Sequence, residues 1–483
     1  MKRGRSLLLV AWVLFGTWFG VPSSARGETR GEREGSRGQA QPPAADTSAG
    51  PDGRPEGATA SEPGAEVQTR PEDVPGIERG GREAGDLSRE LAGGLLWLPR
   101  QTVELLFFAS GNAAGLIDDE QVIPRVEDTL NPPKGEVRVF PTLFVETAGP
   151  LSVGMRMLAR ADNFGSTVRF GFGGRRELVA ESRLRATLAE PRPIVLGIEL
   201  LHDVRGSRGY LGVGQEPTSD PRNIFRTDST EREGKYEEIR ERFITSIGVR
   251  PLEDLELLLS SSITSRHLLD ADDAEEQRLS RVFDLEQLPG GLGLRRITYN
   301  EVGLRVDTRK GRNGAHPGIQ LETYLGHALG IPPTETSFIR SGGRIATYFE
   351  VYKRSNILSP RLVLDTMRPL DNASIPFNEL TRQPDFRGFD SRRDFSSLVA
   401  SLDYRWTVMR YLAARLFADA AIVAPDLPGL RHETPRFAAG SALDFFTRSG
   451  SLGSVTTVFS PEGFKLTLSF GVAGGFGDRQ HRD

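Results

Sequence analysis

Cysteine is absent from the 483 residues, which excludes disulfide bonds, thiolate zinc sites and cysteine nucleophiles. The chain also lacks a Gly-x-Ser-x-Gly elbow, a phosphate-binding glycine loop and a His-Glu-x-x-His motif, and its six histidines are scattered. We therefore expect no enzymatic activity, no cofactor and no metal site. The formal net charge of −4 provides no basic surface for nucleic acid.

Long apolar runs are scarce as well. One run, residues 7–21, follows Lys2, Arg3 and Arg5 and precedes a small-residue cleavage site, so residues 1–25 are predicted to be a secretory signal peptide. An uncleaved membrane anchor is the alternative, although the run is short for a spanning helix. The mean hydropathy of −0.34 argues against a multi-helix membrane protein but not against a transmembrane β-barrel, whose strands are apolar on one face only.

Large apolar residues are nearly missing from residues 26–90, which contain 12 glycines and 7 prolines and no aromatic residue. Such a segment buries too little apolar surface to order itself, so we expect a disordered leader, in the periplasm. Residues 91–135 are predicted to be a short helical or irregular segment. A helix at residues 91–110 would pack under or inside a barrel, or would lie on the membrane surface.

Period-two alternation begins near residue 136 and continues to residue 476. In the last segment Phe464, Leu466 and Leu468 alternate with Lys465 and Thr467. Segments of about ten residues with one apolar and one polar face are long enough to cross a bilayer as tilted strands. The predicted fold is therefore all-β, a transmembrane antiparallel β-barrel over residues 136–476 with a polar tail at 477–483. A soluble secreted β-sandwich also alternates, and it remains the alternative fold.

The alternation yields sixteen strands, an even number as expected for single-chain bacterial barrels. The predicted strands are 137–147, 151–162, 166–174, 177–189, 193–204, 235–250, 254–265, 295–308, 317–328, 338–354, 358–368, 398–408, 411–421, 434–446, 451–459 and 463–476. With both ends in the periplasm, the long connections all fall on the outer side of the membrane: 205–234, 266–294, 329–337, 369–397 and 422–433.

The connection 369–397 is highly charged, and the simplest interpretation is a solvated loop. The following strands, however, place Asp403 and Asp419 on the face predicted to line the lumen. A guanidinium that folded back from the loop would find planar acceptors there and an aromatic ring for stacking. Gly388 would let the backbone approach without a side-chain clash.

These features together resemble the BamA/TamA outer-membrane assembly superfamily, the bacterial surface antigen barrels. The resemblance covers about residues 136–476 and is carried by an Arg-Gly-Phe loop, an acidic-Tyr-Arg strand and a Phe-x-Asp strand. Supporting matches are Tyr210-Leu-Gly-Val-Gly214, Asp307-Thr308-Arg309 and Pro317-Gly318.

The resemblance implies that Arg387, Gly388 and Phe389 form the tip of a loop inside the barrel. It further implies that Asp419 is the main acceptor and Phe417 the packing partner, with Asp403 and Arg405 as the neighbouring pair. The sequence departs from the family pattern at several places: Asp403 replaces a glutamate, Gln383-Pro384 a glycine pair and Ala421 a glycine, and polar residues follow Phe476.

The front of the chain is another departure, because residues 26–90 cannot build the POTRA modules with which family members bind clients. The resemblance is therefore to the branch without such modules. In this family a lateral seam is thought to open between the first and last strands. Candidate seam residues are Pro141, which lacks an amide donor, and Gly471, Gly474 and Gly475, which weaken strand pairing; alternatively, these residues only relieve crowding.

Two functions follow for a bacterial outer-membrane protein. The first is insertion or translocation of protein or lipid through the seam, with outer-membrane lipids and unfolded outer-membrane proteins or periplasmic factors as partners. The second is a passive pore or structural barrel without a client. A plugged lumen favours the first, and an open lumen favours the second.

Overall fold

The computed structural model describes residues 137–470 with several gaps. The described ranges are 137–146, 152–173, 177–188, 193–227, 229–272, 275–309, 317–352, 356–371, 373–383, 385–389, 392–409, 412–446 and 451–470. The expected signal peptide at 1–25, the leader at 26–90, the segment at 91–135, the tail at 477–483 and the seam residues Gly471, Gly474 and Gly475 all lie outside these ranges.

Sixteen strands and two single-turn helices make up the described part of the chain. The strands are β1 (Val137–Glu146), β2 (Ser152–Arg160), β3 (Phe164–Phe172), β4 (Glu177–Leu188), β5 (Ile194–Tyr210), β6 (Gly234–Leu252), β7 (Leu255–Asp270), β8 (Gly293–Asp307), β9 (Gly318–Gly330), β10 (Ser337–Tyr352), β11 (Asn356–Pro369), β12 (Ser396–Met409), β13 (Leu412–Ala424), β14 (Arg436–Phe446), β15 (Ser451–Ser460) and β16 (Gly463–Phe470). The helices are α5 (Leu279–Val282) and η1 (Gly429–Arg431). The prediction of an all-β chain is thus confirmed.

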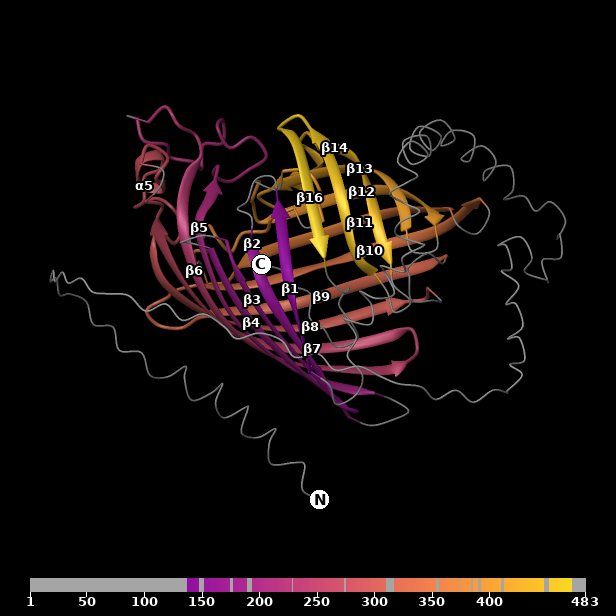
Figure 1. Ribbon diagram of the computed structural model, residues 1–483. Coiled ribbons are helices and arrows are strands. Elements are labelled where there is room, and N and C mark those ends of the chain that lie inside the picture. The colour runs from indigo at the N-terminus through magenta and orange to yellow at the C-terminus, as the bar shows by residue number, and fades with distance from the viewer. Residues whose placement is uncertain are drawn as a thin grey trace, which may run out of the picture. The chain divides into compact units, whose positions relative to one another are not determined.

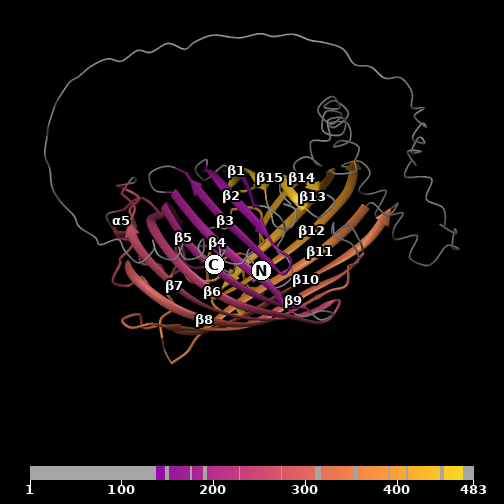
Figure 2. The same cartoon turned by 60° about the horizontal axis from the view of Figure 1, so that its bottom comes forward.

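Each strand pairs antiparallel with its neighbour in the sequence, in one continuous sheet. The strands β1 and β16 also pair, at Val145 with Leu468 and Glu146 with Thr467, so the strand order is that of a closed barrel. Figure 1 shows β1 in indigo beside β16 in yellow, and Figure 2 shows the strands curving round in one sheet.

Burial is inverted relative to a water-soluble domain. On β7 and β8 the carboxylates Glu256 and Glu301 are 4% and 3% exposed, whereas the neighbouring Leu257 and Val302 are 44% and 56% exposed. Because successive side chains of a strand point to opposite faces, the charged side chains face inward and the aliphatic ones outward. The two predicted faces are therefore both present, and the charged face lines the interior.

The long connections lie at one end of the sheet, here called the lid end. They are shorter than expected, because β5, β7 and β13 continue to Tyr210, Asp270 and Ala424, beyond the predicted ends at 204, 265 and 421. Arg208, which the sequence placed in a loop, pairs through Nε with Glu238 Oε2 at 3.0 Å. The sequence at the end of β5 is rich in Gly and Arg, as in many loops. The ion pair inside the barrel nevertheless holds these residues in the strand.

The outward face is not exposed everywhere. Leu402, on the lid-ward half of β12, is 48% exposed, but Tyr404 and Trp406 on the same face are 4% and 1% exposed. They pack with Ala414 and with partly buried aliphatic side chains of β11, β13 and β14. The outward apolar face of β12 is therefore open at Leu402 and covered at Tyr404 and Trp406.

Among the described residues, no helix has the length and apolar character needed to cross a membrane. Within the same residues, no group of three or more His, Asp or Glu side chains could hold a metal ion.

Candidate functional site

The connection between β11 and β12, residues 370–395, folds back over the interior of the sheet. Its base is closed by Thr381 and Asp394, which form an isolated antiparallel bridge. The Thr381 hydroxyl donates to the Asp394 carbonyl at 2.7 Å, and the Asp394 amide donates to the Thr381 carbonyl at 3.2 Å. Both residues are fully buried, so the loop has a fixed base from which its tip extends.

Arg387 at the loop tip contacts two aspartates and a ring. Its backbone amide and its Nε donate to Asp419 Oδ2 at 3.1 and 2.8 Å, and Nη2 donates to the other oxygen of the same carboxylate. Nη1 donates to Asp403 Oδ1. The guanidinium carbon lies 3.6 Å from the centroid of the Phe417 ring. The planar guanidinium therefore binds Asp419 through two nitrogens, donates to Asp403 and stacks on Phe417 at the same time. A lysine ammonium could not make all of these contacts.

The two aspartates reach this point from neighbouring strands. Asp403 on β12 lies opposite Phe417 on β13, and Asp419 lies opposite Ser401. Inward positions alternate along each strand, so Asp403, Phe417 and Asp419 form one cluster on the interior wall. All three are buried, at 8%, 5% and 2% exposure.

The charge state of the anchor follows from its partners. Burial alone lowers the pKa of Arg387, but the hydrogen bonds to Asp419 and the negative charge of Asp403 outweigh it, so the net shift is upward. The guanidinium is therefore charged throughout the physiological range. The site therefore holds one guanidinium between the carboxylates of Asp403 and Asp419.

Gly388 and Phe389 complete the predicted tip. A Cβ atom on Gly388 would lie 2.6 Å from Phe386 Cε1 and 3.1 Å from Ala438 Cβ, so glycine is required by close approach. Phe389 extends toward the first residue of β16, where a Cβ on Gly463 would lie 3.9 Å from its ring. The tip thus contacts the wall at β12 and β13 and lies near the start of the last strand.

Arg405 and Pro141 are the remaining residues singled out in the sequence. Arg405 shares the inward face of β12 with Asp403 and lies opposite Arg415, whose Nη2 donates to Asp444 Oδ1 at 2.9 Å. Pro141 lies in β1 opposite Met155 of β2, in the strand that also pairs with β16.

The connection 211–233 after β5 follows a path that was not predicted from the sequence. Gln215 donates from Nε2 to the Thr434 carbonyl at 2.7 Å and accepts from the Val423 amide at 2.9 Å. Val423 lies at the end of β13, eight strands further along the sheet from β5. This connection therefore spans the interior from one wall to the opposite wall.

The two loops are joined to each other. Arg222 donates to both oxygens of Asp394 at 2.9 and 2.7 Å, and the Gly214 amide donates to the Arg393 carbonyl at 2.9 Å. Hydrogen bonds to Asp394 raise the pKa of Arg222, against the opposing effect of burial. Residues 211–233, 271–292 and 370–395, here called the lid, thus form one connected structure at the lid end.

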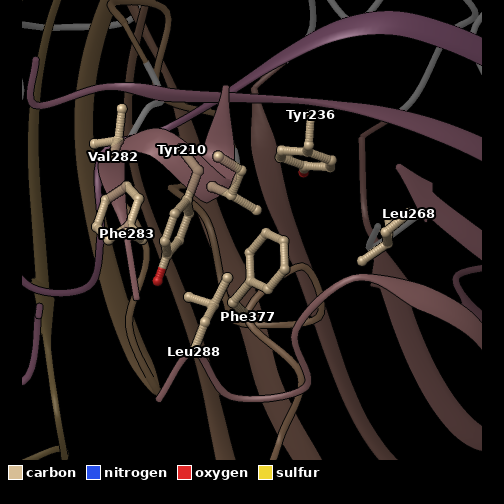
Figure 3. Packing of buried hydrophobic residues seen from close by; sticks show 8 residues of the cluster. Tyr210, Tyr236, Leu268, Val282, Phe283, Leu288 and Phe377 are labelled. Atoms are coloured by element: carbon tan, nitrogen blue, oxygen red, sulfur yellow. The ribbon is translucent and has the colours of Figure 1, made fainter. Parts of the chain in front are cut away.

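An apolar cluster lies beneath the lid. Tyr210 and Tyr236, from β5 and β6, pack on Phe377 of the β11–β12 loop with ring centroids 4.7 and 5.3 Å away. Phe283, which follows α5, packs on Tyr210 at 5.1 Å. Figure 3 shows these rings converging from four segments of the chain. The lid therefore has a core of its own, which was not predicted from the sequence.

Two glycines of the 211–233 loop are the sequence feature that points to its unusual backbone path. Gly212 and Gly214 adopt φ angles of +102° and +92°, in the left-handed region that disfavours side chains. Both belong to the Tyr210–Gly214 segment that supports the family resemblance. The glycines indicate a special backbone, but they do not reveal that Gln215 reaches the opposite wall.

Comparisons with known proteins were made by sequence and by structure. No family model matches the chain, and no curated protein matches its sequence. Among solved structures, BamA from Haemophilus ducreyi lacking POTRA domains 1-3 aligns with a TM-score of 0.49 and 12% identity, over 68% of this chain and 69% of that chain. OccK5 (OpdH) of Pseudomonas aeruginosa aligns with a TM-score of 0.30 and 9% identity, over 69% of this chain and 92% of that chain. The copper transporter OprC aligns with a TM-score of 0.28 and 11% identity, over 68% and 54%.

Proposed function

We propose that this chain is a sixteen-stranded outer-membrane β-barrel of the BamA/TamA surface antigen type, without POTRA modules. Its function is to insert or translocate protein or lipid at the outer membrane through the seam between β1 and β16. The leader, residues 26–90, lies in the periplasm. The partners are outer-membrane lipids and either unfolded outer-membrane proteins or periplasmic factors, and the proposal includes no enzymatic step.

The membrane location is supported by the inverted burial. Exposed aliphatic and aromatic side chains recur along the outward faces, for example Leu259 at 53%, Leu325 at 58% and Phe437 at 59% exposure. A surface of this kind costs free energy in water and gains it in lipid. Charged side chains in the interior form ion pairs, as Arg340 does with Asp365. Their charges are thus compensated inside the barrel and kept away from the lipid.

The observation that carries the proposed activity is that two loops cross the lid end of the barrel. The connection 211–233 reaches β13 through Gln215, and Arg387 holds a second loop against the interior wall. Loops in these positions leave less room for the continuous aqueous path that a passive pore requires. A barrel whose lumen is closed by its own loops can still act on a substrate at its wall, where the strands meet the lipid.

The substrate would enter the membrane at the wall formed by β1 and β16. Pro141 in β1 cannot donate a ladder hydrogen bond, and the described residues of the two strands pair at Val145 with Leu468 and Glu146 with Thr467. Phe389 of the anchored loop lies near Gly463 at the start of β16. The loop is thus in a position to sense or restrain the last strand.

The alternative is a passive pore, and one observation favours it. The interior wall of β4 to β6 is lined with charge, including Arg183, whose Nε lies 3.4 Å from Glu199 Oε2, and Arg242, whose Nη2 lies 3.3 Å from Glu199 Oε1. Rings of charged side chains set ion selectivity in channels. If the loops move aside in the membrane, this wall would face the conducting path.

The experiment that separates the two functions uses the full-length protein reconstituted into liposomes. The folding of an unfolded outer-membrane protein is timed against empty liposomes, against wild type and against Arg387→Ala. Lipid transfer between leaflets is followed in the same liposomes with a fluorescent lipid, and conductance is recorded in planar bilayers. Arg392→Ala in the same loop serves as the matched control, because the charge of Arg387 alone is paired with Asp403 and Asp419.

Faster folding or faster lipid transfer with wild type, lost in Arg387→Ala and kept in Arg392→Ala, would support the seam activity. Large, steady conductance of wild type without either activity would support the pore. Identical behaviour of wild type and Arg387→Ala in all three assays would contradict a functional role for the anchored loop.

A further inference from the structure

A cavity of about 280 Å³ lies inside the lid, between the end of β5 and the loops 211–233, 271–292 and 370–395. It is separate from the Arg387 anchor, since none of the anchor residues lines it. An engineered protein cavity of about 150 Å³ binds benzene. The volume in the lid therefore admits a substituted single ring.

The walls of the cavity are mainly apolar. Tyr210 and Phe283, with ring centroids 5.1 Å apart, form an aromatic corner, and Leu288, Ile375 and Leu380 form the rest of the buried lining. These five residues are between 1% and 8% exposed. Ile224, which is 41% exposed, marks the side that opens to the surface. A flat, apolar molecule fits such a lining better than a charged one.

Most polar groups of the lining already have partners. Arg222 is held by Asp220 and Asp394, and its charge is balanced by both. The Asn223 side chain donates to the carbonyls of Val213 and Pro217 at 2.8 Å each. Asp284, also in the lining, accepts from the Glu286 amide and from Gln287 Nε2, both at 3.2 Å. These groups therefore already have hydrogen-bond partners within the lid.

The Tyr210 hydroxyl is the exception. Tyr210 is 1% exposed, and its described contacts are the rings of Phe283 and Phe377 and the guanidinium of Arg393 over its face. No described residue forms a hydrogen bond with its hydroxyl, which points toward Leu288 (Figure 3). A buried tyrosine hydroxyl normally has a partner, so this one identifies where a ligand oxygen would lie.

We propose that the lid cavity binds a small single-ring aromatic molecule that carries one hydroxyl group. The ring packs in the corner formed by Tyr210 and Phe283, and the hydroxyl exchanges a hydrogen bond with the Tyr210 hydroxyl. Binding would bridge the three loops of the lid, because each of them contributes to the lining. The inference is independent of the proposed seam activity, since it needs only the folded lid.

The test is ligand-detected ¹⁹F NMR on the full-length protein in lipid nanodiscs. The probe is 4-fluorophenol, and its partner is 4-fluorotoluene, in which a methyl group replaces the hydroxyl. Ala373→Phe fills the cavity, and Ser374→Leu is a second filling variant in case the first does not fold. Ala418→Phe, on the outward face of β13, introduces the same ring elsewhere and serves as the matched control. Partitioning of the probes into lipid is common to all samples.

We expect saturable binding of 4-fluorophenol to wild type and to Ala418→Phe, about fivefold or more tighter than that of 4-fluorotoluene. A filling variant that remains folded should lose this binding. Tyr210→Phe should bind both probes about equally, because the hydrogen bond is gone while the apolar walls remain. Wild-type binding no stronger than that of a folded filling variant would overturn the site, and an undiminished preference in Tyr210→Phe would overturn the role of its hydroxyl.

Discussion

Arg387, which is partly buried, and Arg393, which is buried, are two arginines of the same loop with different surroundings. Arg387 donates to Asp419 and Asp403 and lies 3.6 Å above the Phe417 ring. Arg393 is 5% exposed, yet its side chain contacts the Tyr236 hydroxyl and the Gly209 carbonyl at 3.4 Å each, with the Tyr210 ring 5.8 Å away. Arg387 donates hydrogen bonds to two carboxylates, whereas the hydrogen bonds of Arg393 go to two neutral oxygens and the carboxylate charge of Glu238 acts on it without one.

The difference separates two ways of holding a loop. A compensated arginine fixes a position strongly, because removing it leaves buried carboxylates without a partner. An arginine among neutral groups has a large desolvation cost and weak contacts, so its removal costs little. We therefore expect the position of the loop to depend on Arg387, while Arg393 sits in a lid that other contacts hold together.

Arg387→Ala should have the largest effect. It leaves Asp403 and Asp419 buried and unpaired, which costs about 3–5 kcal/mol, part of which is relieved if the loop leaves the wall. Urea unfolding of the reconstituted barrel, followed by tryptophan fluorescence, measures the loss. Chymotrypsin cleavage at Phe386 and Phe389 reports loop release in the folded barrel and should become much faster.

Arg392→Ala is the control for this variant. Burial and the neighbouring charge of Arg436 lower the pKa of Arg392 to about 10, so its charge is not favoured by its surroundings. Its removal should leave both unfolding and cleavage close to wild type. Equal effects of Arg387→Ala and Arg392→Ala would contradict a specific anchoring role for Arg387, since either arginine would then hold the loop equally well.

Arg387→Lys should have an intermediate effect. The ammonium keeps the positive charge but cannot donate to both oxygens of Asp419 and to Asp403 from one planar group, and it loses the flat contact with Phe417. We expect a loss of about 2 kcal/mol by urea unfolding, clearly smaller than that of Arg387→Ala. A lysine variant as unstable as the alanine variant would show that geometry, and not charge, determines the anchor.

Gly388→Ala tests whether the backbone beside Arg387 must lie this close to the Phe386 ring. The new methyl group would meet Phe386 Cε1 at 2.6 Å, so the Phe386 ring has to move. Overpacking of this kind costs about 1–3 kcal/mol. Faster chymotrypsin cleavage at Phe386 together with reduced stability would agree, whereas wild-type stability would mean that the ring has space to turn away.

Much of this fold could be predicted from the sequence, because strand periodicity is a local property. The alternation around Val302 and Glu301 identifies both a strand and its two faces. The ends of strands were predicted less well. At β5 the residues after Val204 were predicted to be a loop, but Arg208 pairs with Glu238 across the ladder, and that partner can be identified only once the register is known.

The anchor could be predicted for a similar reason. Asp403, Phe417 and Asp419 have the inward parity of their strands, and the resemblance supplied Arg387. Arg405 shares that parity but lies opposite Arg415, because parity fixes a face and not a partner. The bonds of Gln215 were beyond prediction, since it contacts backbone groups of Val423 and Thr434, and backbone groups carry no sequence signal.

Arg393→Met should have the smallest effect. The substitution removes a buried cation that has no carboxylate among its described hydrogen-bond partners, so it relieves the desolvation cost of that cation without leaving a hydrogen-bonded carboxylate unpaired. It also leaves the Tyr236 hydroxyl without its donor, which costs about 1–3 kcal/mol. The two effects nearly cancel, so the free energy of unfolding should change by less than about 1 kcal/mol. The double variant Arg393→Met with Tyr236→Phe removes the orphaned hydroxyl and should be more stable than the single variant by urea unfolding. A loss as large as that of Arg387→Ala would mean that neutral partners can hold a buried guanidinium as firmly as two carboxylates, and the distinction between the two arginines would fail.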